Sequence, residues 1–177
     1  MKITVFYKSK YGATKKYAAM LKEELSCDIY DTADYKKVLY ERYDCVIFAG
    51  AVYAGEIAGM NILRKIYENI KNKKIMILCV GTSPFDEEAI EEIKTHNLKE
   101  ELRGIPLFYA RGAWDEGGVT FKDRAMCKML QKMIAKQDTD SCKPWMRELL
   151  CSQGKEWDWT DRKYLLPLLK YIRNGHI

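Results

Sequence analysis

Short, nearly continuous apolar runs recur along this chain and alternate with stretches of helical periodicity. Four runs stand out, Ile3–Tyr7, Cys45–Gly50, Ile75–Val80 and Ile105–Ala110, and a weaker one covers Cys27–Tyr30. Continuous rather than alternating apolar sequence is typical of parallel strands that are covered on both faces. Strand–helix alternation favours right-handed crossovers. The sequence therefore predicts an α/β fold with a doubly wound, five-stranded parallel sheet in the order 2-1-3-4-5, with Cys27–Tyr30 as an edge strand.

Apolar residues at helical spacing predict the inward faces of three helices. They are Ala18, Leu21 and Leu25 in the first, Ile62, Ile66 and Ile70 in the second, and Leu165, Leu168, Leu169 and Ile172 in a closing helix over Asp161–Asn174. Ser83 and Pro84, followed by acids at 86–88, predict another helix start with a cap and a first-turn proline.

Composition indicates an ordinary soluble protein. The chain has 177 residues, of which 47% are hydrophobic and 31% charged, which suits one domain over 1–177. No apolar run approaches the roughly 18 residues that cross a bilayer. Met1 leads directly into a strand without the layout of a signal peptide, so we expect a cytoplasmic protein.

The cysteines predict reduced, structural thiols. Cys27, Cys45 and Cys79 lie in or beside apolar strand-like runs, where cysteine usually acts as a small buried hydrophobe. The others, Cys127, Cys142 and Cys151, lie in helical-looking sequence. Neither a Cys-x-x-Cys pair nor a Cys/His cluster occurs, so the sequence predicts no metal site.

The turn after the first strand has the features of a phosphate-binding loop. Helix-start N–H groups carry partial positive charge and have no intrahelical partner. Ser9 and Thr14 add hydroxyls, and Gly12 allows the backbone to approach a ligand closely. The loop fits neither a Walker loop nor the three-glycine dinucleotide fingerprint. An ordinary turn with Thr14 near the helix cap is the alternative.

Two further loops are predicted at the same edge of the sheet, where ligands of such folds bind. Gly50–Gly55 follows the third strand and has two glycines flanking Tyr53. Val80–Pro84 follows the fourth strand and is small and hydroxyl-rich. Small residues let the backbone approach a flat ring, and Tyr53 can pack against one. Together with the first loop, these loops favour a flavin ligand over three unrelated turns.

The Ser-x-x-Gly-x-Thr pattern at 9–14 resembles the flavin mononucleotide (FMN) loop of flavodoxins, although Tyr11 stands where a third hydroxyl is usual. Nearly the whole chain is similar to bacterial flavodoxin-domain proteins related to menaquinone-dependent protoporphyrinogen dehydrogenases, through residues 7–14, 43–55, 107–112 and 121–126. The resemblance implies a flavodoxin-like fold with FMN as cofactor. It assigns the phosphate to Ser9, Lys10, Tyr11, Gly12, Ala13 and Thr14, and the ring to Ala51, Val52, Tyr53, Ala54 and Gly55 together with Gly81, Thr82 and Ser83.

Residues 113–159 exceed a minimal fold of this kind and predict a helical insertion after the last strand. Between 122 and 136 an apolar stripe runs beside cations: the stripe is Met126, Met129, Leu130, Met133 and Ile134, and the cations are Arg124, Lys128, Lys132 and Lys136. One interpretation packs the stripe on the core. The other makes 122–136 a surface for an anionic partner or a membrane, suited to a quinone or a carboxylated tetrapyrrole. Arg111 and Trp114 either line an opening there, or Arg111 is a structural ion-pair partner.

Three functional hypotheses remain open: an FMN-dependent, quinone-linked oxidoreductase, a non-enzymatic electron carrier, and a flavin-free interaction domain. With a net charge of +5, the chain lacks the acidity that steers flavodoxins to basic redox partners. Its acids and bases are intermixed and it carries no nucleic-acid motif, so we expect no nucleic-acid partner. His96 and His176 are interpreted as solvated helix-end residues, and no catalytic residue is assigned.

Overall fold

The computed structural model describes residues 1–115, 125, 128–129, 132–133 and 156–174. A parallel sheet with the order β2-β1-β3-β5-β6 forms its centre. In that order the strands are Asp28–Asp31, Ile3–Lys8, Cys45–Tyr53, Lys74–Gly81 and Leu107–Arg111. The order is the one predicted, with the weak apolar run at the edge. The fold class is therefore confirmed as an α/β, flavodoxin-like doubly wound sheet.

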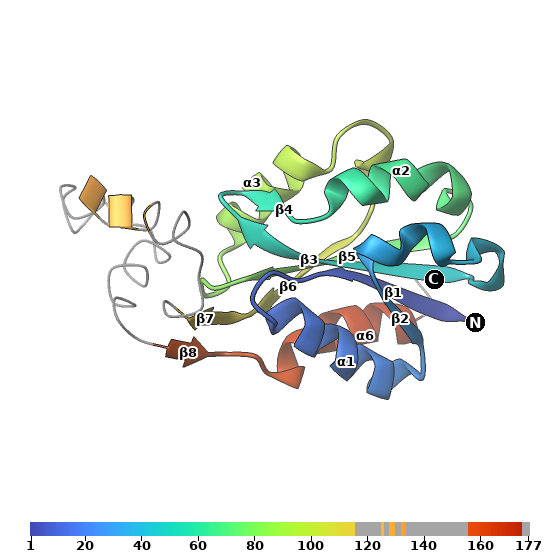
Figure 1. Cartoon of the computed structure of the whole chain (residues 1–177), viewed down its shortest axis with the longest axis horizontal. Helices are drawn as coiled ribbons and strands as arrows, with labels where there is room; N and C mark the ends of the chain where they lie inside the picture. The colour runs from blue at the N-terminus through green and yellow to red at the C-terminus, as the bar shows by residue number, and fades with distance from the viewer. Residues whose placement is uncertain (116–124, 126–127, 130–131, 134–155, 175–177) are drawn as a thin grey trace.

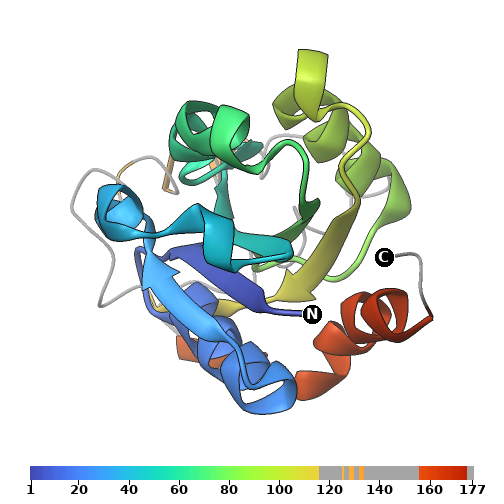
Figure 2. The same cartoon turned by 90° about the vertical axis from the view of Figure 1, so that its right-hand side faces the viewer.

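Helices cover both faces of the sheet (Figures 1 and 2). One face carries α1 (Ala13–Leu25) and α6 (Leu166–Arg173), and the other carries α2 (Met60–Ile70) and α3 (Glu87–Asn97). Short 3₁₀ turns complete the connections: η1 (Thr32–Lys37), η2 (Tyr40–Arg42), η3 (Glu100–Leu102) and η5 (Arg162–Leu165).

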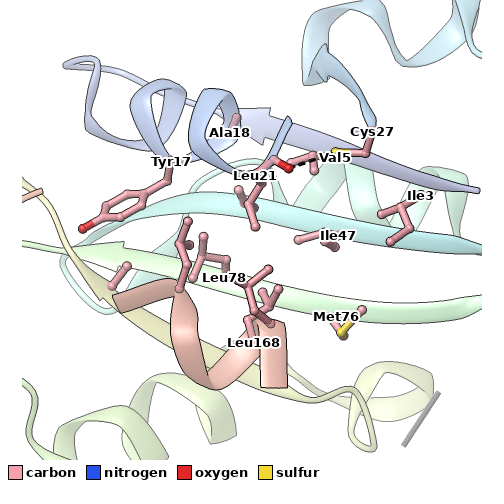
Figure 3. Close-up of a cluster of buried hydrophobic side chains, with 14 of the residues drawn as sticks. Ile3, Val5, Tyr17, Ala18, Leu21, Cys27, Ile47, Met76, Leu78 and Leu168 are labelled. Atoms are coloured by element: carbon pink, nitrogen blue, oxygen red, sulfur yellow. Dashed lines mark hydrogen bonds between the residues drawn. The ribbon is translucent and has the colours of Figure 1, made fainter. Parts of the chain in front are cut away.

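The core under α1 and α6 joins helix side chains to side chains on one face of the sheet (Figure 3). Leu21 and Leu168 are fully buried there against Val5, Ile47 and Leu78. Each such side chain contributes about 1.5–3 kcal/mol by leaving water. The predicted inward faces of both helices are confirmed: Ala18, Leu165 and Leu169 are buried as well, while Leu25 and Ile172 are partly buried.

The second core lies under α2 and α3. The sequence pattern placed Ile62 on its inward face, but Leu63 takes that position and Ile62 is only partly buried. Three- and four-residue steps from Met60 reach Leu63, Ile66 and Ile70, which are all buried. The predicted face was therefore rotated by one residue at its start.

The start of α3 also differs from the prediction. Asp86, not Ser83, is the N-cap residue, because its Oδ1 accepts a hydrogen bond from the Ala89 N–H at 2.9 Å. Pro84 lies before the cap and therefore outside the first turn. Glu87 and Glu88 do occupy that turn, where acids suit the helix dipole.

The two ends of the predicted insertion meet in a small ribbon beyond β6. Strand β7 (Ala113–Asp115) pairs antiparallel with β8 (Glu156–Asp158), and Trp114 stands opposite Trp157 in the register. Of the Met-rich stripe, Met129 and Met133 are described and each is 57% exposed. The other stripe residues, Met126, Leu130 and Ile134, lie outside the described residues, and so do two of the flanking cations, Arg124 and Lys136. No helix of the described part is long and apolar enough to cross a membrane.

Three of the cysteines confirm the prediction of structural thiols. Cys27, Cys45 and Cys79 are buried and free. Burial raises the pKa of the Cys27 thiol to about 11 and the pKa values of Cys45 and Cys79 to about 12. Thiols with such pKa values stay protonated near neutrality and are poor nucleophiles. The other three cysteines and His176 lie outside the described residues.

Candidate functional site

Three loops meet at the carboxyl edge of the sheet, on the left of Figure 1. They follow β1, β3 and β5, which are neighbours in the sheet. The strand order changes direction between β1 and β3, and a doubly wound sheet binds ligands at this switch point. The predicted loops therefore share one edge.

The loop after β1 contains a buried polar atom that lacks a partner. The Thr14 side chain is 1% exposed, and its Oγ1 makes no hydrogen bond within the described part of the chain. Leaving a buried hydroxyl unsatisfied costs about 1–3 kcal/mol. Thr14 lies in the first turn of α1, where N–H groups also lack intrahelical acceptors. The turn thus offers unused donors to an anion.

Gly12 shapes the same loop. It is the N-cap residue of α1 with a φ of 93°, a conformation that L side chains rarely adopt. A Cβ at this position would meet no atom within 4 Å, so the space over the helix start is open. The Gly12 N–H donates to Ser9 Oγ at 3.1 Å, which places that hydroxyl at the helix start. Ser9, Gly12 and Thr14 therefore lie together as predicted.

The predicted loop after β3 is mostly strand and hairpin. Strand β3 continues to Tyr53 and pairs with β4 (Glu56–Ile57) through a two-residue turn. Ala54 and Gly55 have φ values of 49° and 81°, as a type I′ turn requires. Gly50 was predicted as the last residue of the strand and the first of the loop, and it lies inside β3. A Cβ there would come within 2.5 Å of Ile57 Cγ2, so the hairpin itself requires this glycine.

Asn97 anchors that hairpin, and sequence reasoning missed it. The residue is 1% exposed at the end of α3. Its Oδ1 accepts from the Ile57 N–H at 2.9 Å, and its Nδ2 donates to the Gly55 and Ile93 carbonyls at 2.7 and 2.8 Å. No local sequence signal could have found this contact, because the hairpin lies 40 residues before Asn97.

His96, next to Asn97, also contacts the hairpin. Its Nε2 lies 2.5 Å from Glu56 Oε1. The histidine side chain is 52% exposed in the last turn of α3, in accord with the prediction of a solvated helix-end residue.

Lys10 links the first loop to the hairpin. Its Nζ lies 5.3 Å from the centre of the Tyr11 ring and 5.1 Å from the centre of the Tyr53 ring. Both distances are within the range of cation–π attraction. We call these two contacts of Lys10 the cation–π clamp. Tyr11 and Tyr53 are 38% and 37% exposed, so the clamp lies at the surface. The two loops are thus joined by one ammonium group.

Hydrogen bonds from β6 and from the residue that follows it hold the loop after β5. Tyr109 Oη donates to the Ser83 carbonyl at 2.5 Å, and Arg111 Nε donates to the Thr82 carbonyl at 2.9 Å. The Gly112 N–H donates to the Gly81 carbonyl at 2.6 Å. The carbonyls of all three predicted residues of this loop, Gly81, Thr82 and Ser83, therefore accept hydrogen bonds from residues 109–112.

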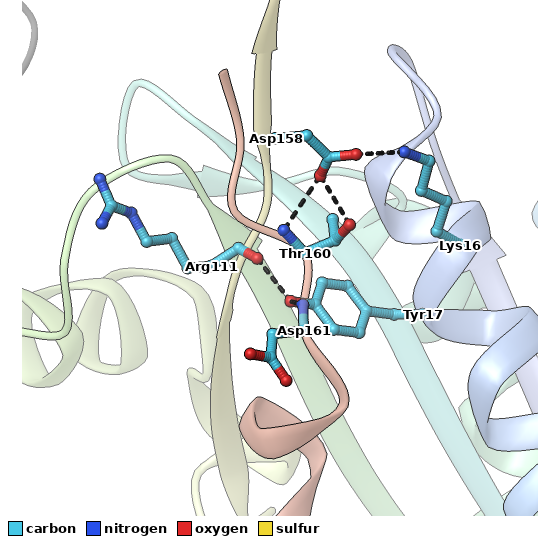
Figure 4. A network of polar contacts seen from close by, with 6 residues as sticks. All are labelled: Lys16, Tyr17, Arg111, Asp158, Thr160 and Asp161. Carbon is cyan, nitrogen blue, oxygen red and sulfur yellow. Dashed lines mark hydrogen bonds and ion pairs between the residues drawn. The ribbon is translucent and has the colours of Figure 1, made fainter.

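A polar network fixes the ribbon to α1 (Figure 4). Tyr17 Oη donates to the Arg111 carbonyl at 2.5 Å and accepts from the Asp161 N–H at 3.1 Å. Burial raises the pKa of Tyr17 to about 12. Lys16 Nζ lies 2.5 Å from Asp158 Oδ2, and hydrogen bonds from Lys16 and Thr160 lower the pKa of Asp158 to about 2.

Comparison with known proteins agrees with this arrangement. The family model described as "Flavodoxin domain" matches residues 4–141. The chain belongs to the flavodoxin-domain family. No curated protein matches it significantly.

Solved flavodoxin-type structures are similar to the chain at low sequence identity. A flavoprotein from Lactobacillus acidophilus in complex with FMN is 13% identical with a TM-score of 0.45, covering 62% of this chain and 91% of that one. The Trp repressor binding protein of Bacillus subtilis is 17% identical with a TM-score of 0.45, covering 63% and 83%. A flavodoxin, WrbA-like protein from Agrobacterium tumefaciens is 15% identical with a TM-score of 0.44, covering 62% and 83%.

Proposed function

We propose that this flavodoxin-domain protein binds FMN at the carboxyl edge of its sheet and acts as a redox protein. The observation that carries the proposal is the buried Thr14 hydroxyl in the first turn of α1, which has no hydrogen-bond partner among the residues that the structure describes. A phosphate supplies the acceptor oxygens that such a hydroxyl and the neighbouring N–H groups need. Gly12 leaves the space above them open. FMN, with its terminal phosphate, matches this donor set within a fold whose family binds flavins.

The residues proposed to hold FMN divide into two sets. Ser9, Lys10, Tyr11, Gly12, Ala13 and Thr14 would hold the phosphate. Ala51, Val52, Tyr53, Ala54 and Gly55 would contact one side of the ring, with Gly81, Thr82 and Ser83 on the other. The first set offers donors, and the second offers a hairpin and a loop whose shapes are fixed by Asn97 and by β6. When bound, the flavin would supply the capacity to take up one or two electrons.

Within this proposal, the protein is a quinone-linked oxidoreductase related to the protoporphyrinogen dehydrogenases. The resemblance at residues 7–14, 43–55, 107–112 and 121–126 supports that assignment. The basic, Met-rich segment 122–136 is proposed to face the membrane or an anionic partner. Two exposed methionines, Met129 and Met133, favour this over packing on the core.

The experiment begins with the flavin content of the purified protein. We expect an oxidised-flavin spectrum and one FMN released per chain on denaturation. Anaerobic reduction of the flavin by a porphyrinogen, followed by its reoxidation with menadione over many turnovers, would support the oxidoreductase. Photoreduction of the flavin and its reoxidation, without turnover of a porphyrinogen, would support a simple electron carrier. A protein that neither contains nor takes up FMN would contradict the proposal and leave the flavin-free interaction domain.

A further inference from the structure

The buried face of α1 carries two hydroxyl groups one turn apart. Thr14 and Tyr17 are three residues apart and are 1% and 0% exposed, so both side chains lie on the face that packs on the sheet. The Thr14 hydroxyl has no hydrogen-bond partner among the described residues, whereas the Tyr17 hydroxyl has two. The proposed function assigns the first hydroxyl to the phosphate. The second is placed to hold the helix turn that carries the first.

Tyr17 joins α1 to both sides of the predicted insertion at 113–159 (Figure 4). Its Oη donates to the carbonyl of Arg111, which lies 94 residues away and just before the insertion. The same oxygen accepts from the N–H of Asp161, which lies 144 residues away and just after the insertion. A hydroxyl that both donates and accepts is fixed in direction by its two partners. One side chain therefore ties the start of α1 to two distant segments.

The same two segments contact each other and the first residue of α1. Gly112 lies so close to the helix that a Cβ on it would come within 3.2 Å of the Ala13 Cβ. The Trp159 N–H donates to the Gly112 carbonyl at 3.1 Å. The N–H groups at a helix start point along the helix axis, so their direction follows the tilt of the helix. That tilt is set by residues 111–112 and 159–161, which together we call the ribbon base.

We propose that Tyr17 is the positioning residue of the phosphate site and that it couples phosphate binding to the ribbon base. Groups that hold a ligand through several hydrogen bonds must keep their positions within about 0.5 Å, so a small tilt of α1 weakens all of its donors together. Because coupling between two sites is reciprocal, a phosphate at the helix start also tightens the contacts of Tyr17 with Arg111 and Asp161. The identity of the ligand rests on the proposed function, but the coupling requires only a phosphate group.

The first test compares FMN and riboflavin on Tyr17→Phe. This variant keeps the buried ring and loses both hydrogen bonds. We expect its FMN affinity to fall about tenfold and its riboflavin affinity to change less than about twofold, because only the phosphate depends on the direction of the α1 donors. Calorimetry on the apoprotein gives both values. A residue that served the fold alone would leave the ratio of the two affinities at its wild-type value.

Tyr40→Phe is the matched control. Tyr40 is also buried, and its Oη donates to the Tyr35 carbonyl. It belongs to the core under α2 and α3 and not to the core under α1. The control should therefore keep the ratio of FMN to riboflavin affinity within about twofold of wild type, as expected for a distant site. An equal change of the ratio in both variants would reflect any lost tyrosine hydroxyl and would overturn the proposal.

Hydrogen exchange tests the coupling in the other direction and on the unmodified protein. The Asp161 N–H is bound by the Tyr17 hydroxyl, so we expect saturating FMN to slow its exchange by about tenfold relative to the Leu98 N–H. The Leu98 N–H donates to the Lys94 carbonyl at the end of α3 and reports the stability of the fold as a whole. Saturating inorganic phosphate should also slow exchange at Asp161. In Tyr17→Phe, neither compound should change it more than about twofold.

The outcomes distinguish this inference from the FMN proposal. A protein that binds FMN, and whose Tyr17→Phe variant keeps the wild-type affinity ratio, would overturn the inference and keep the proposed function. A protein that binds no FMN, but in which inorganic phosphate slows exchange at Asp161 only when Tyr17 is present, would do the reverse. No response of Asp161 to FMN or to phosphate would overturn the coupling. If Tyr17→Phe fails to fold, the exchange measurement on the unmodified protein decides the matter.

Discussion

The loop at 9–14 and the hairpin at 51–57 lie at neighbouring strand ends, but they use their polar groups in opposite ways. The loop leaves the Thr14 hydroxyl without a partner inside the described structure. The hairpin has the Gly55 carbonyl and the Ile57 N–H bound by the buried amide of Asn97. One region therefore has a polar group left over for a ligand, whereas the polar groups of the other are bound within the protein.

This difference matches the two parts of the proposed cofactor. A phosphate is charged and needs donors that have no other partner. A flavin ring is flat and mostly apolar, so it needs a surface of fixed shape. The cation–π clamp of Lys10 with Tyr11 and Tyr53 joins the two regions, so a change in one should be felt in the other. Variants can test whether the division holds.

The largest effect is expected for Gly12→Val. The backbone at φ 93° is strained for any L side chain, and the new group would project over the helix start. We expect FMN affinity to fall by about a hundredfold or more, because the helix-start donors lose their geometry. Retention of FMN on gel filtration and calorimetry measure it. Gly104→Val is the control, since Gly104 has open space and no positive φ. Equal FMN retention by both variants would contradict the phosphate loop.

Thr14→Val should separate ligand binding from folding. The substitution keeps the shape and removes an unsatisfied hydroxyl, so the free energy of unfolding of the apoprotein should stay unchanged or rise by up to about 1 kcal/mol. FMN affinity should fall about ten- to fiftyfold, since a hydrogen bond to a charged group is lost. Thermal unfolding and calorimetry give the two values.

Thr4→Val is the matched control for that variant. Thr4 is also fully buried, but its Oγ1 donates to the Asp28 carbonyl at 3.3 Å. This control should lose about 1 kcal/mol of stability and bind FMN normally. The same pattern in both threonine variants would show that the Thr14 hydroxyl serves the fold instead of a ligand.

A smaller effect on FMN is expected for Asn97→Asp. The carboxylate keeps an acceptor for the Ile57 N–H but loses both donors, so the carbonyls of Gly55 and Ile93 face a negative charge. Stability should fall by about 2–4 kcal/mol. FMN affinity should fall about fivefold through loss of the hairpin's shape. Hydrogen exchange at the Ile57 amide reports the local loosening. Asn61→Asp, at an exposed helix position, is the control.

The smallest effect concerns the ribbon anchor. Folding lowers the pKa of Asp158 from 3.8 to about 2, so its contribution to stability is present above pH 3.8 and is lost as the pH falls toward 2. The Lys16 and Asp158 side chains are 54% and 48% exposed, so solvent screening keeps that contribution below about 1 kcal/mol. Asp158→Asn should abolish the acid-dependent change in near-ultraviolet tryptophan dichroism and alter FMN affinity less than about twofold. An unchanged acid transition in Asp158→Asn would remove this pair from the account.

The sequence predicted the features that depend on local pattern. Apolar runs placed the strands, and the strand–helix alternation gave their order, because burial on both faces requires continuous apolar sequence. Gly12 and Thr14 were placed at the start of a helix because a glycine beside a helix start has a recognisable spacing. Buried cysteines followed from their apolar neighbours in the same way.

Features that depend on distant contacts could not be predicted. Gly50 was interpreted as one of two glycines flanking Tyr53 in a ligand loop, although its missing side chain makes room for Ile57 in the same hairpin. Asn97 looked like an ordinary residue near a helix end, because its partners lie in another element. The contact between Arg111 and Trp159 depends on segments 48 residues apart that are joined by the hydrogen bond from the Trp159 N–H to the Gly112 carbonyl, which no local spacing encodes.

The most direct test of the account is a calorimetric comparison of FMN and riboflavin on the apoprotein. The two ligands share the ring and differ by the phosphate, so their affinity ratio reports the loop at 9–14 alone. We predict one FMN bound per chain, with riboflavin weaker by about a hundredfold or more, as expected when several charge-assisted hydrogen bonds are lost. Equal affinities, or no binding of FMN to folded protein, would contradict a phosphate site at the start of α1.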